Sequence, residues 1–106
     1  SLFAWATFQI AQMESESDED YDLSQAEYHA FYAMNPDHPD AEKAMFSRGF
    51  ILDENLQRED EALEVLEAFQ QKYPKSELKE SVDWLVENIK SNGKLADDLM
   101  KKISEE

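Results

Sequence analysis

An internal repeat constrains the fold of this chain more than any other feature of its sequence. When the sequence is shifted by 38 residues against itself, Pro36 coincides with Pro74, and Ala30-Phe31 coincides with Ala68-Phe69. The same shift pairs large residues with large ones and small with small: Tyr28 with Leu66, Ser24 with Ala62, Phe8 with Phe46, Ala6 with Ala44, and Ala11 with Gly49. A self-match with a period of about 20 to 50 residues is typical of structural units that stack on one another.

Each unit is predicted to consist of helices. Only two glycines and three prolines interrupt the 106 residues, and the best helix formers, among them Ala, Leu, Glu and Lys, are abundant. Ala62, Leu66 and Phe69 recur at the spacing of one helical face, and residues 76–91 carry the same pattern. The sequence therefore predicts an all-α fold. Six helices are expected, over 2–13, 22–35, 39–55, 58–73, 76–91 and 95–104.

The expected helix boundaries coincide with residues that interrupt helices. Pro39 suits the first position of a helix, and Ser76 is a candidate N-cap. Asn92-Gly93 is expected to end the fifth helix, because glycine readily adopts the left-handed conformation. Residues 14–21 are predicted to form an acidic loop. The six helices then pair as three antiparallel hairpins in one domain, 1–106, with units over 2–36, 39–74 and 76–104.

Two of these units resemble tetratricopeptide (TPR) repeats. In that family, helix A carries a bulky and then a small residue, and helix B carries an alanine, an aromatic residue and a following proline. The second unit supplies Phe46, Gly49, Ala62, Phe69 and Pro74, and the first supplies Phe8, Ala11, Ser24, Phe31 and Pro36. The third unit retains only Trp84, with Glu87 in place of the small residue, and is predicted to be degenerate. The stretches 38–49 and 69–74 resemble the longer TPR-like repeats of bacterial cell-envelope proteins, of the barrel-assembly and Tol–Pal types.

The resemblance implies a short TPR-like solenoid that acts as a non-catalytic scaffold for another protein, in the periplasm or cell envelope. In TPR arrays the A helices line a concave groove. The contacts expected from that geometry are Trp5, Gln12, Lys43, Phe50, Asp53 and Glu54. Because Asp53 and Glu54 are acidic, the expected guest is a basic or amphipathic helical segment.

The charge distribution points to the same class of partner. The formal net charge is −15, which makes nucleic acid a poor partner. All ten basic residues lie in 43–106, so a basic protein would be steered towards the N-terminal half. An alternative, that the acidity only keeps the protein in solution, stays open. No stretch approaches the ~20 apolar residues of a membrane span. The chain begins at Ser1 without a signal peptide, so we expect a processed product or part of a longer protein.

No motif for catalysis or metal binding stands out. Asp18, Asp20 and Asp22 match the first ligands of an EF-hand loop, but Leu23 and His29 occupy its two diagnostic positions. The two histidines are not spaced as a zinc-binding pair on one helix, and there is no cysteine or glycine-rich phosphate loop. We therefore expect no enzyme activity, cofactor or metal.

The first predicted helix favours a second role. Residues 2–11 are apolar around nearly the whole circumference, whereas a terminal repeat normally presents a polar face to water. We expect this segment to pack against an upstream repeat or a second copy of the chain. The alternative function is therefore a structural module that self-associates through residues 2–11. The aromatic side chains elsewhere, including Phe46 and Trp84, are predicted to fill space between hairpins.

Overall fold

In the described part of the chain, residues 18–105 of a computed structural model, all regular secondary structure is helical. No strand occurs between these residues, so the all-α prediction is confirmed for them. The predicted helix 2–13, with Trp5 and Gln12, lies outside the described residues. The elements are α2 (Asp18–Met34), α3 (Ala41–Phe50), the π-helical segment η1 (Ile51–Asn55), α4 (Glu59–Lys72), α5 (Lys79–Lys90) and α6 (Lys94–Ser104). None of the described helices has the length and apolar character needed to cross a membrane.

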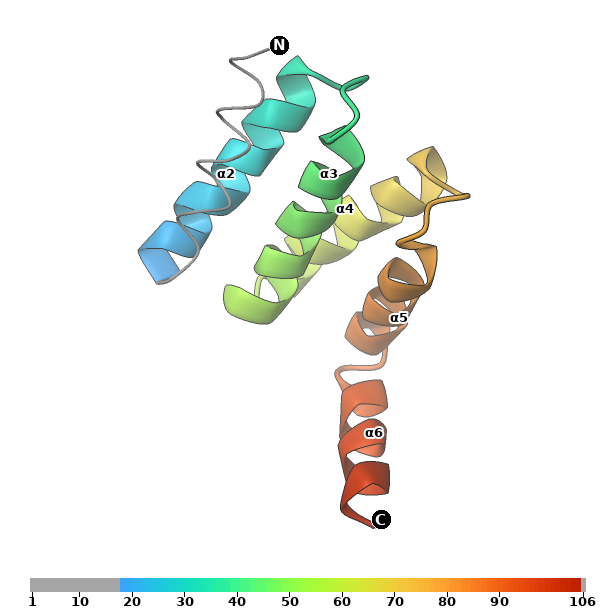
Figure 1. The fold of residues 1–106 in the computed structure, drawn as a ribbon. Coiled ribbons are helices and arrows are strands. Elements are labelled where there is room, and N and C mark those ends of the chain that lie inside the picture. The colour runs from blue at the N-terminus through green and yellow to red at the C-terminus, as the bar shows by residue number, and fades with distance from the viewer. Residues whose placement is uncertain (1–17, 106) are drawn as a thin grey trace.

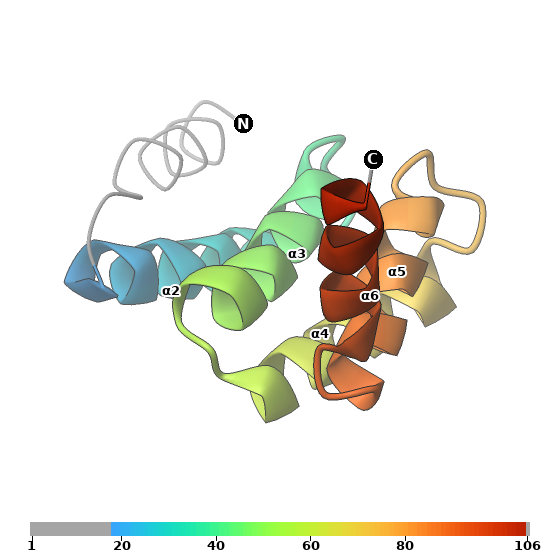
Figure 2. The same cartoon turned by 90° about the horizontal axis from the view of Figure 1, so that it is seen from below.

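Along α2 to α5 each helix runs roughly antiparallel to the one before it, and α4 lies behind α3 in the view of Figure 1. Consecutive helices from α2 to α5 are in direct contact. Helix α6 breaks the pattern, because it extends away from α5 instead of folding back along it (Figures 1 and 2). The prediction that 76–104 forms a closed antiparallel hairpin was therefore wrong.

The 38-residue repeat is confirmed in the hydrogen bonds of two turns. The Asn35 amide donates to the Phe31 carbonyl at 2.9 Å, and the Tyr73 amide donates to the Phe69 carbonyl at 2.8 Å. Three further backbone pairs recur with the same offset, ending with Ala44 to Asp40 and Val82 to Leu78. Even the side-chain bonds correspond. His38 Nδ1 accepts from the Asp40 amide at 3.0 Å, and Ser76 Oγ accepts from the Leu78 amide at 2.9 Å.

These turns explain why α3 and α5 begin later than predicted. Asp40 and Leu78 are the N-cap residues, so the helices start at Ala41 and Lys79. Pro39 is therefore not the first helical residue, and Ser76 is not an N-cap. The Ser76 hydroxyl instead accepts a hydrogen bond from the Leu78 amide, two residues later, and the turn that this bond stabilises competes with a helix that would start at Ser76.

The core occupies the positions that the repeat predicts. Ser24 and Ala62 are fully buried, as are the aromatic rings of Phe31 and Phe69. Leu66 lies beside Phe69 in the larger of two clusters, which joins α4 to α5 and η1. The buried members of that cluster are Leu52, Ala62, Val65, Leu66, Phe69, Val82, Leu85, Val86 and Ile89. A smaller cluster between α2 and α3 contains Tyr28, Phe31, Ala44 and Ile51.

Gly49 allows α3 to approach α4 closely. A Cβ atom at this position would lie 2.6 Å from Leu66 Cδ2 and 2.9 Å from Leu66 Cγ. Leu66 is fully buried, so its side chain has no free space into which to move. The predicted role of Gly49 as a small residue at a helix contact is confirmed.

Two segments differ from the sequence-based boundaries for identifiable reasons. Helix α2 begins at Asp18, so residues 18–21 are helical rather than part of a loop. Acidic residues in a first turn interact favourably with the helix dipole, which offsets their low helix propensity. The predicted helix 39–55 contains the π-helical segment η1, in which the Leu56 amide donates to the Ile51 carbonyl at 3.0 Å. This wider turn changes which residues share a face after Phe50.

The stop predicted at Asn92-Gly93 is confirmed and has the form of a Schellman motif. The Gly93 amide donates to the Asn88 carbonyl at 2.8 Å, and the Asn92 amide donates to the Ile89 carbonyl at 3.1 Å. Both Asn92 and Gly93 have positive φ, at 56° and 81°. Asn88 also accepts from the Ala96 amide through Oδ1 at 2.9 Å, so a side chain of α5 caps the start of α6. These bonds fix the direction in which α6 leaves α5.

Candidate functional site

The strongest candidate for a binding site is a groove between α3 and α5. It consists of two adjoining clefts that share Phe46, and we call the pair the α3–α5 groove. One cleft, of about 440 Å³, lies between the C-terminal half of α3 and the face of α5. The other, of about 730 Å³, lies between the N-terminal half of α3 and the turn at 73–78. Helices α3 and α5 begin 38 residues apart, at Ala41 and Lys79, so the smaller cleft lies between corresponding positions of the repeat.

Apolar side chains form the floor of the smaller cleft. Phe46 packs on the core at 6.4 Å from the ring of Phe69, and its other neighbour, Phe50, is 6.2 Å away. Phe50 and Trp84 remain 41% and 39% exposed, so two large aromatic side chains of the same cleft are open to solvent. Trp84 was predicted to be a space filler between hairpins, and that prediction was wrong. Its side chain lines the smaller cleft and stays partly open to solvent.

The two ends of the groove carry different charge. The smaller cleft is lined by Glu54 and Glu80 and contains no basic residue, so we call it the acidic end. The larger cleft is lined by three lysines, Lys43, Lys72 and Lys75, together with two glutamates, and we call it the basic end. The Lys72 ammonium lies 5.0 Å from the ring of Tyr32 and 5.9 Å from that of Tyr73. Lys43 and Lys75 are exposed.

Of the four described residues predicted to contact a partner, three line this groove. Phe50 and Glu54 lie together at the acidic end, and Lys43 lies at the basic end. Asp53 does not line either cleft. Its Oδ2 atom is buried without a hydrogen-bond partner, and this burial, with the charges of Glu54 and Glu59, raises its pKa to about 6. The π-helical turn separates Asp53 from the Phe46–Phe50 face, which a regular α-helix would not do.

Sequence reasoning missed the contribution of α5 to the groove. Trp84 stands 38 residues after Phe46, and Ser81 stands 38 residues after Lys43. Applying the repeat to the predicted contact Lys43 would have identified Ser81, whereas Trp84 corresponds to Phe46, which was predicted only to fill space. Glu80 is likewise the counterpart of Glu42, and both line the groove.

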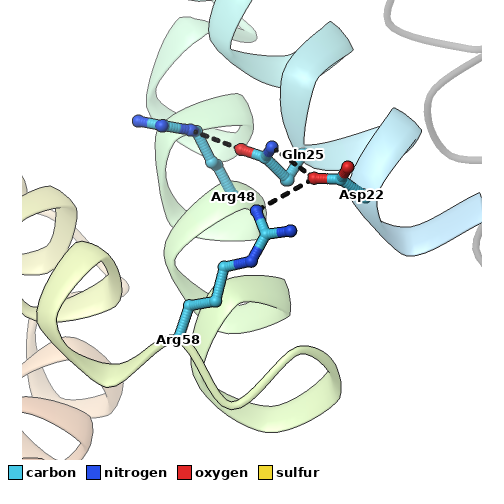
Figure 3. A network of polar contacts seen from close by, with 4 residues as sticks. All are labelled: Asp22, Gln25, Arg48 and Arg58. Carbon is cyan, nitrogen blue, oxygen red and sulfur yellow. Dashed lines mark hydrogen bonds and ion pairs between the residues drawn. The ribbon is translucent and has the colours of Figure 1, made fainter. Parts of the chain in front are cut away.

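A polar network anchors α3 on the side that faces α2 (Figure 3). Arg48 Nε donates to Gln25 Oε1 at 3.0 Å, and Gln25 Nε2 donates to Asp22 Oδ1 at 3.0 Å. Arg58 Nη1 also donates to Asp22 Oδ1, at 2.9 Å. Hydrogen bonds from Gln25 and Arg58 lower the pKa of Asp22. The network joins α2, α3 and the residue before α4, and so fixes the helix that carries Phe46 and Phe50.

A second cavity, of about 340 Å³, lies between α2, α3 and α4, away from the groove. Its polar lining includes His29, Arg48, Glu61 and Glu64. Burial lowers the pKa of Arg48, and the charges of Glu61 and Glu64 oppose that effect. Within residues 18–105 no group of three or more His, Asp or Glu side chains is placed to hold a metal ion.

Comparisons with protein-family models, with curated proteins and with solved structures give no match for this chain.

Proposed function

We propose that this chain is a non-catalytic, TPR-like interaction module whose α3–α5 groove binds an amphipathic helix of another protein. The observation that carries the proposal is the exposure of Phe50 on α3 and Trp84 on α5, which line one cleft together with the partly buried ring of Phe46. Partly exposed aromatic side chains in a concave site are the usual anchors of a protein interface. Helices that insert an apolar face into such a groove are a common form of peptide recognition.

The size of the groove suits a short helix. Lys43, Phe46, Phe50 and Glu54 follow one another along α3 and η1 at helical spacing. A regular helix rises 1.5 Å per residue, so these positions span roughly 16 Å, or about three turns. An 11-residue guest helix has the same length and would contact the groove from end to end.

The charges of the groove favour one direction for the guest. Basic side chains of the guest would lie beside Glu54 and Glu80, and acidic ones beside Lys43 and Lys75. The guest would therefore be an amphipathic helix with acidic residues towards its N-terminus and basic residues towards its C-terminus. That arrangement also stabilises the guest helix itself, through its dipole.

Fluorescence anisotropy with two labelled synthetic helices tests the proposal. The first has leucines on one face, aspartates at its N-terminal end and lysines at its C-terminal end. The second has the same leucines with the charges exchanged, and both are held helical by the same hydrocarbon staple. We expect the first to bind more tightly, with the difference decreasing as salt shortens the Debye length below about 10 Å.

Groove variants locate the binding. Phe50→Ala and Trp84→Ala should each weaken binding of the first helix by about tenfold or more, the range found for aromatic anchors. Met34→Ala is the matched control, because Met34 is exposed on α2 and lies outside the groove. The proposal fails if neither helix binds, or if Met34→Ala weakens binding as much as the groove variants do.

A further inference from the structure

Helix α6 presents an apolar face that nothing in the described part of the chain covers. Leu99, Met100 and Ile103 are 50%, 64% and 56% exposed, and their spacing places them on one side of the helix. With Phe50 and Trp84 they make up five of the seven large hydrophobic side chains that are exposed among the described residues. The other two, Leu23 and Met34, are single residues on α2.

The charges of α6 match those of the α3–α5 groove. Asp97 lies in its first turn, next to Asp98, and Lys101 and Lys102 lie in its last turn; Lys94 precedes the acidic pair and Glu105 follows the basic pair. Lys102 is three residues after Leu99 and therefore borders the apolar face. From Asp97 to Lys102, the stretch that carries Leu99 and Met100, this is the acidic-to-basic order that the groove favours in a guest helix. Helix α6 contains 11 residues, which gives it the length of about three turns that the groove accommodates.

The connection to α5 directs α6 away from the body of its own chain (Figures 1 and 2). The Schellman bonds of Asn92 and Gly93, and the bond from the Ala96 amide to Asn88 Oδ1, hold it in that direction. A helix held in this direction can contact a second molecule with its apolar face.

We infer that α6 of one copy of this chain binds in the α3–α5 groove of a second copy. Leu99 and Ile103 contact the Phe46–Phe50–Trp84 floor, and Lys102 lies beside the glutamates of the acidic end. A reciprocal exchange of α6 between two copies forms a closed dimer. This inference rests on the proposed function, because it names the helix that occupies the same groove. It differs from self-association through residues 2–11, which involves a separate part of the chain.

The oligomeric state, measured by light scattering over a range of protein concentrations, gives the first test. The wild-type chain should change from monomer to dimer as concentration rises. The double variant Leu99→Glu/Ile103→Glu should remain a monomer, and the matched control Met34→Glu should dimerise like the wild type. Because these three side chains are exposed, none of the changes should unfold the domain. A wild-type chain that stays monomeric, or a double variant that dimerises normally, overturns the inference.

Disulfide trapping gives the position and the direction of α6. The chain has no cysteine, so Ser81→Cys at the acidic end of the groove and Met100→Cys on α6 can be introduced singly. A mixture of the two variants should form an intermolecular disulfide far faster than a mixture of Met100→Cys with Ala33→Cys, which lies on α2. Equal rates in the two mixtures overturn the inference. In the double cysteine variant at high dilution, a disulfide formed within one chain also overturns it, because α6 would then occupy its own groove.

The synthetic helices separate this inference from the proposed function. The Leu99→Glu/Ile103→Glu chain retains an intact groove and should bind the labelled helix at least as tightly as the wild type, because no second α6 competes. If that helix binds but the wild-type chain never self-associates, the inference fails and the proposed function remains.

A charge exchange tests the contact of Lys102 with the acidic end of the groove. If the two surfaces are complementary in charge, Lys102→Glu should lower the affinity of the dimer by about tenfold. Mixing Lys102→Glu with Glu80→Lys should restore part of the loss.

Discussion

The partly buried carboxylate of Asp53 leads to a prediction about stability. One of its oxygens has no hydrogen-bond partner, and the nearby charges of Glu54 and Glu59 oppose its ionisation. Its pKa is therefore raised from 3.8 to about 6 in the folded protein. Because the folded state binds this proton more tightly than the unfolded state, ionisation lowers stability. The loss develops as pH rises from about 4 to above 6. Replacing the carboxylate with a neutral amide in Asp53→Asn should remove this loss.

The magnitude follows from the difference between the two pKa values. At about 1.4 kcal/mol per pKa unit, the difference corresponds to at most ~3 kcal/mol at neutral pH and above. Two effects reduce this value: the Asp53 side chain keeps partial contact with solvent, and the amide introduced by Asp53→Asn would also have a buried polar atom without a hydrogen-bond partner. We therefore expect Asp53→Asn to raise the free energy of unfolding by about 1 to 2 kcal/mol at pH 8. The gain should fall to about half at pH 5 and nearly vanish near pH 4.

Urea unfolding followed by circular dichroism, at pH 8, 6.5, 5 and 4, measures this dependence on pH. Asp37→Asn is the matched control, because Asp37 is exposed in the turn between α2 and α3. It should change stability by less than about 0.5 kcal/mol at each pH. A stability gain for Asp53→Asn that is independent of pH, or a loss at pH 8, would refute the reasoning.

Three further changes test the packing and the connection to α6. Gly49→Ala should lower stability by about 1 kcal/mol in urea unfolding, because overpacking against Leu66 exceeds the gain in helix propensity; a stabilised variant would show that α3 and α4 can separate. Phe69→Ala should cost about 3 to 5 kcal/mol, whereas Phe50→Ala should cost less than about 1 kcal/mol; similar losses would contradict their different burial. Asn88→Ala removes a cap worth about 1 kcal/mol, so it should speed hydrogen exchange of the α6 amides about fivefold. Exchange of the α4 amides should not change. If the variant and the wild type exchange their α6 amides at the same rate, Asn88 does not cap α6.

The repeat made much of the fold predictable. Positions 38 residues apart share burial and hydrogen bonds, because stacked units place equivalent residues in equivalent surroundings. The groove residues Phe50 and Glu54 were predicted from the geometry of the TPR arrays that the sequence resembles. Periodicity predicts only which side of a helix is apolar. It correctly placed Ala62, Leu66 and Phe69 in the core, but it could not indicate that Trp84 stays exposed.

The parts that could not be predicted depend on local backbone geometry or on contacts distant in sequence. Asp53 leaves the groove face because of a single π-helical turn, for which the residues 51–55 give no clear signal. The direction of α6 depends on the side chain of Asn88, which caps a helix eight residues later in the sequence. The late start of α5 depends on the hydroxyl of Ser76, which closes a turn instead of capping the helix.

The most direct test of the central claim is an NMR titration of the ¹⁵N-labelled Leu99→Glu/Ile103→Glu chain with the acidic-to-basic synthetic helix. If the α3–α5 groove is the binding surface, the largest changes in chemical shift should occur at the Trp84 indole and at the amides of Phe46, Phe50 and Ser81. The amides of residues around the second cavity, such as His29 and Glu64, should change little. Shifts concentrated at that cavity, or none at saturating helix concentration, would contradict the account.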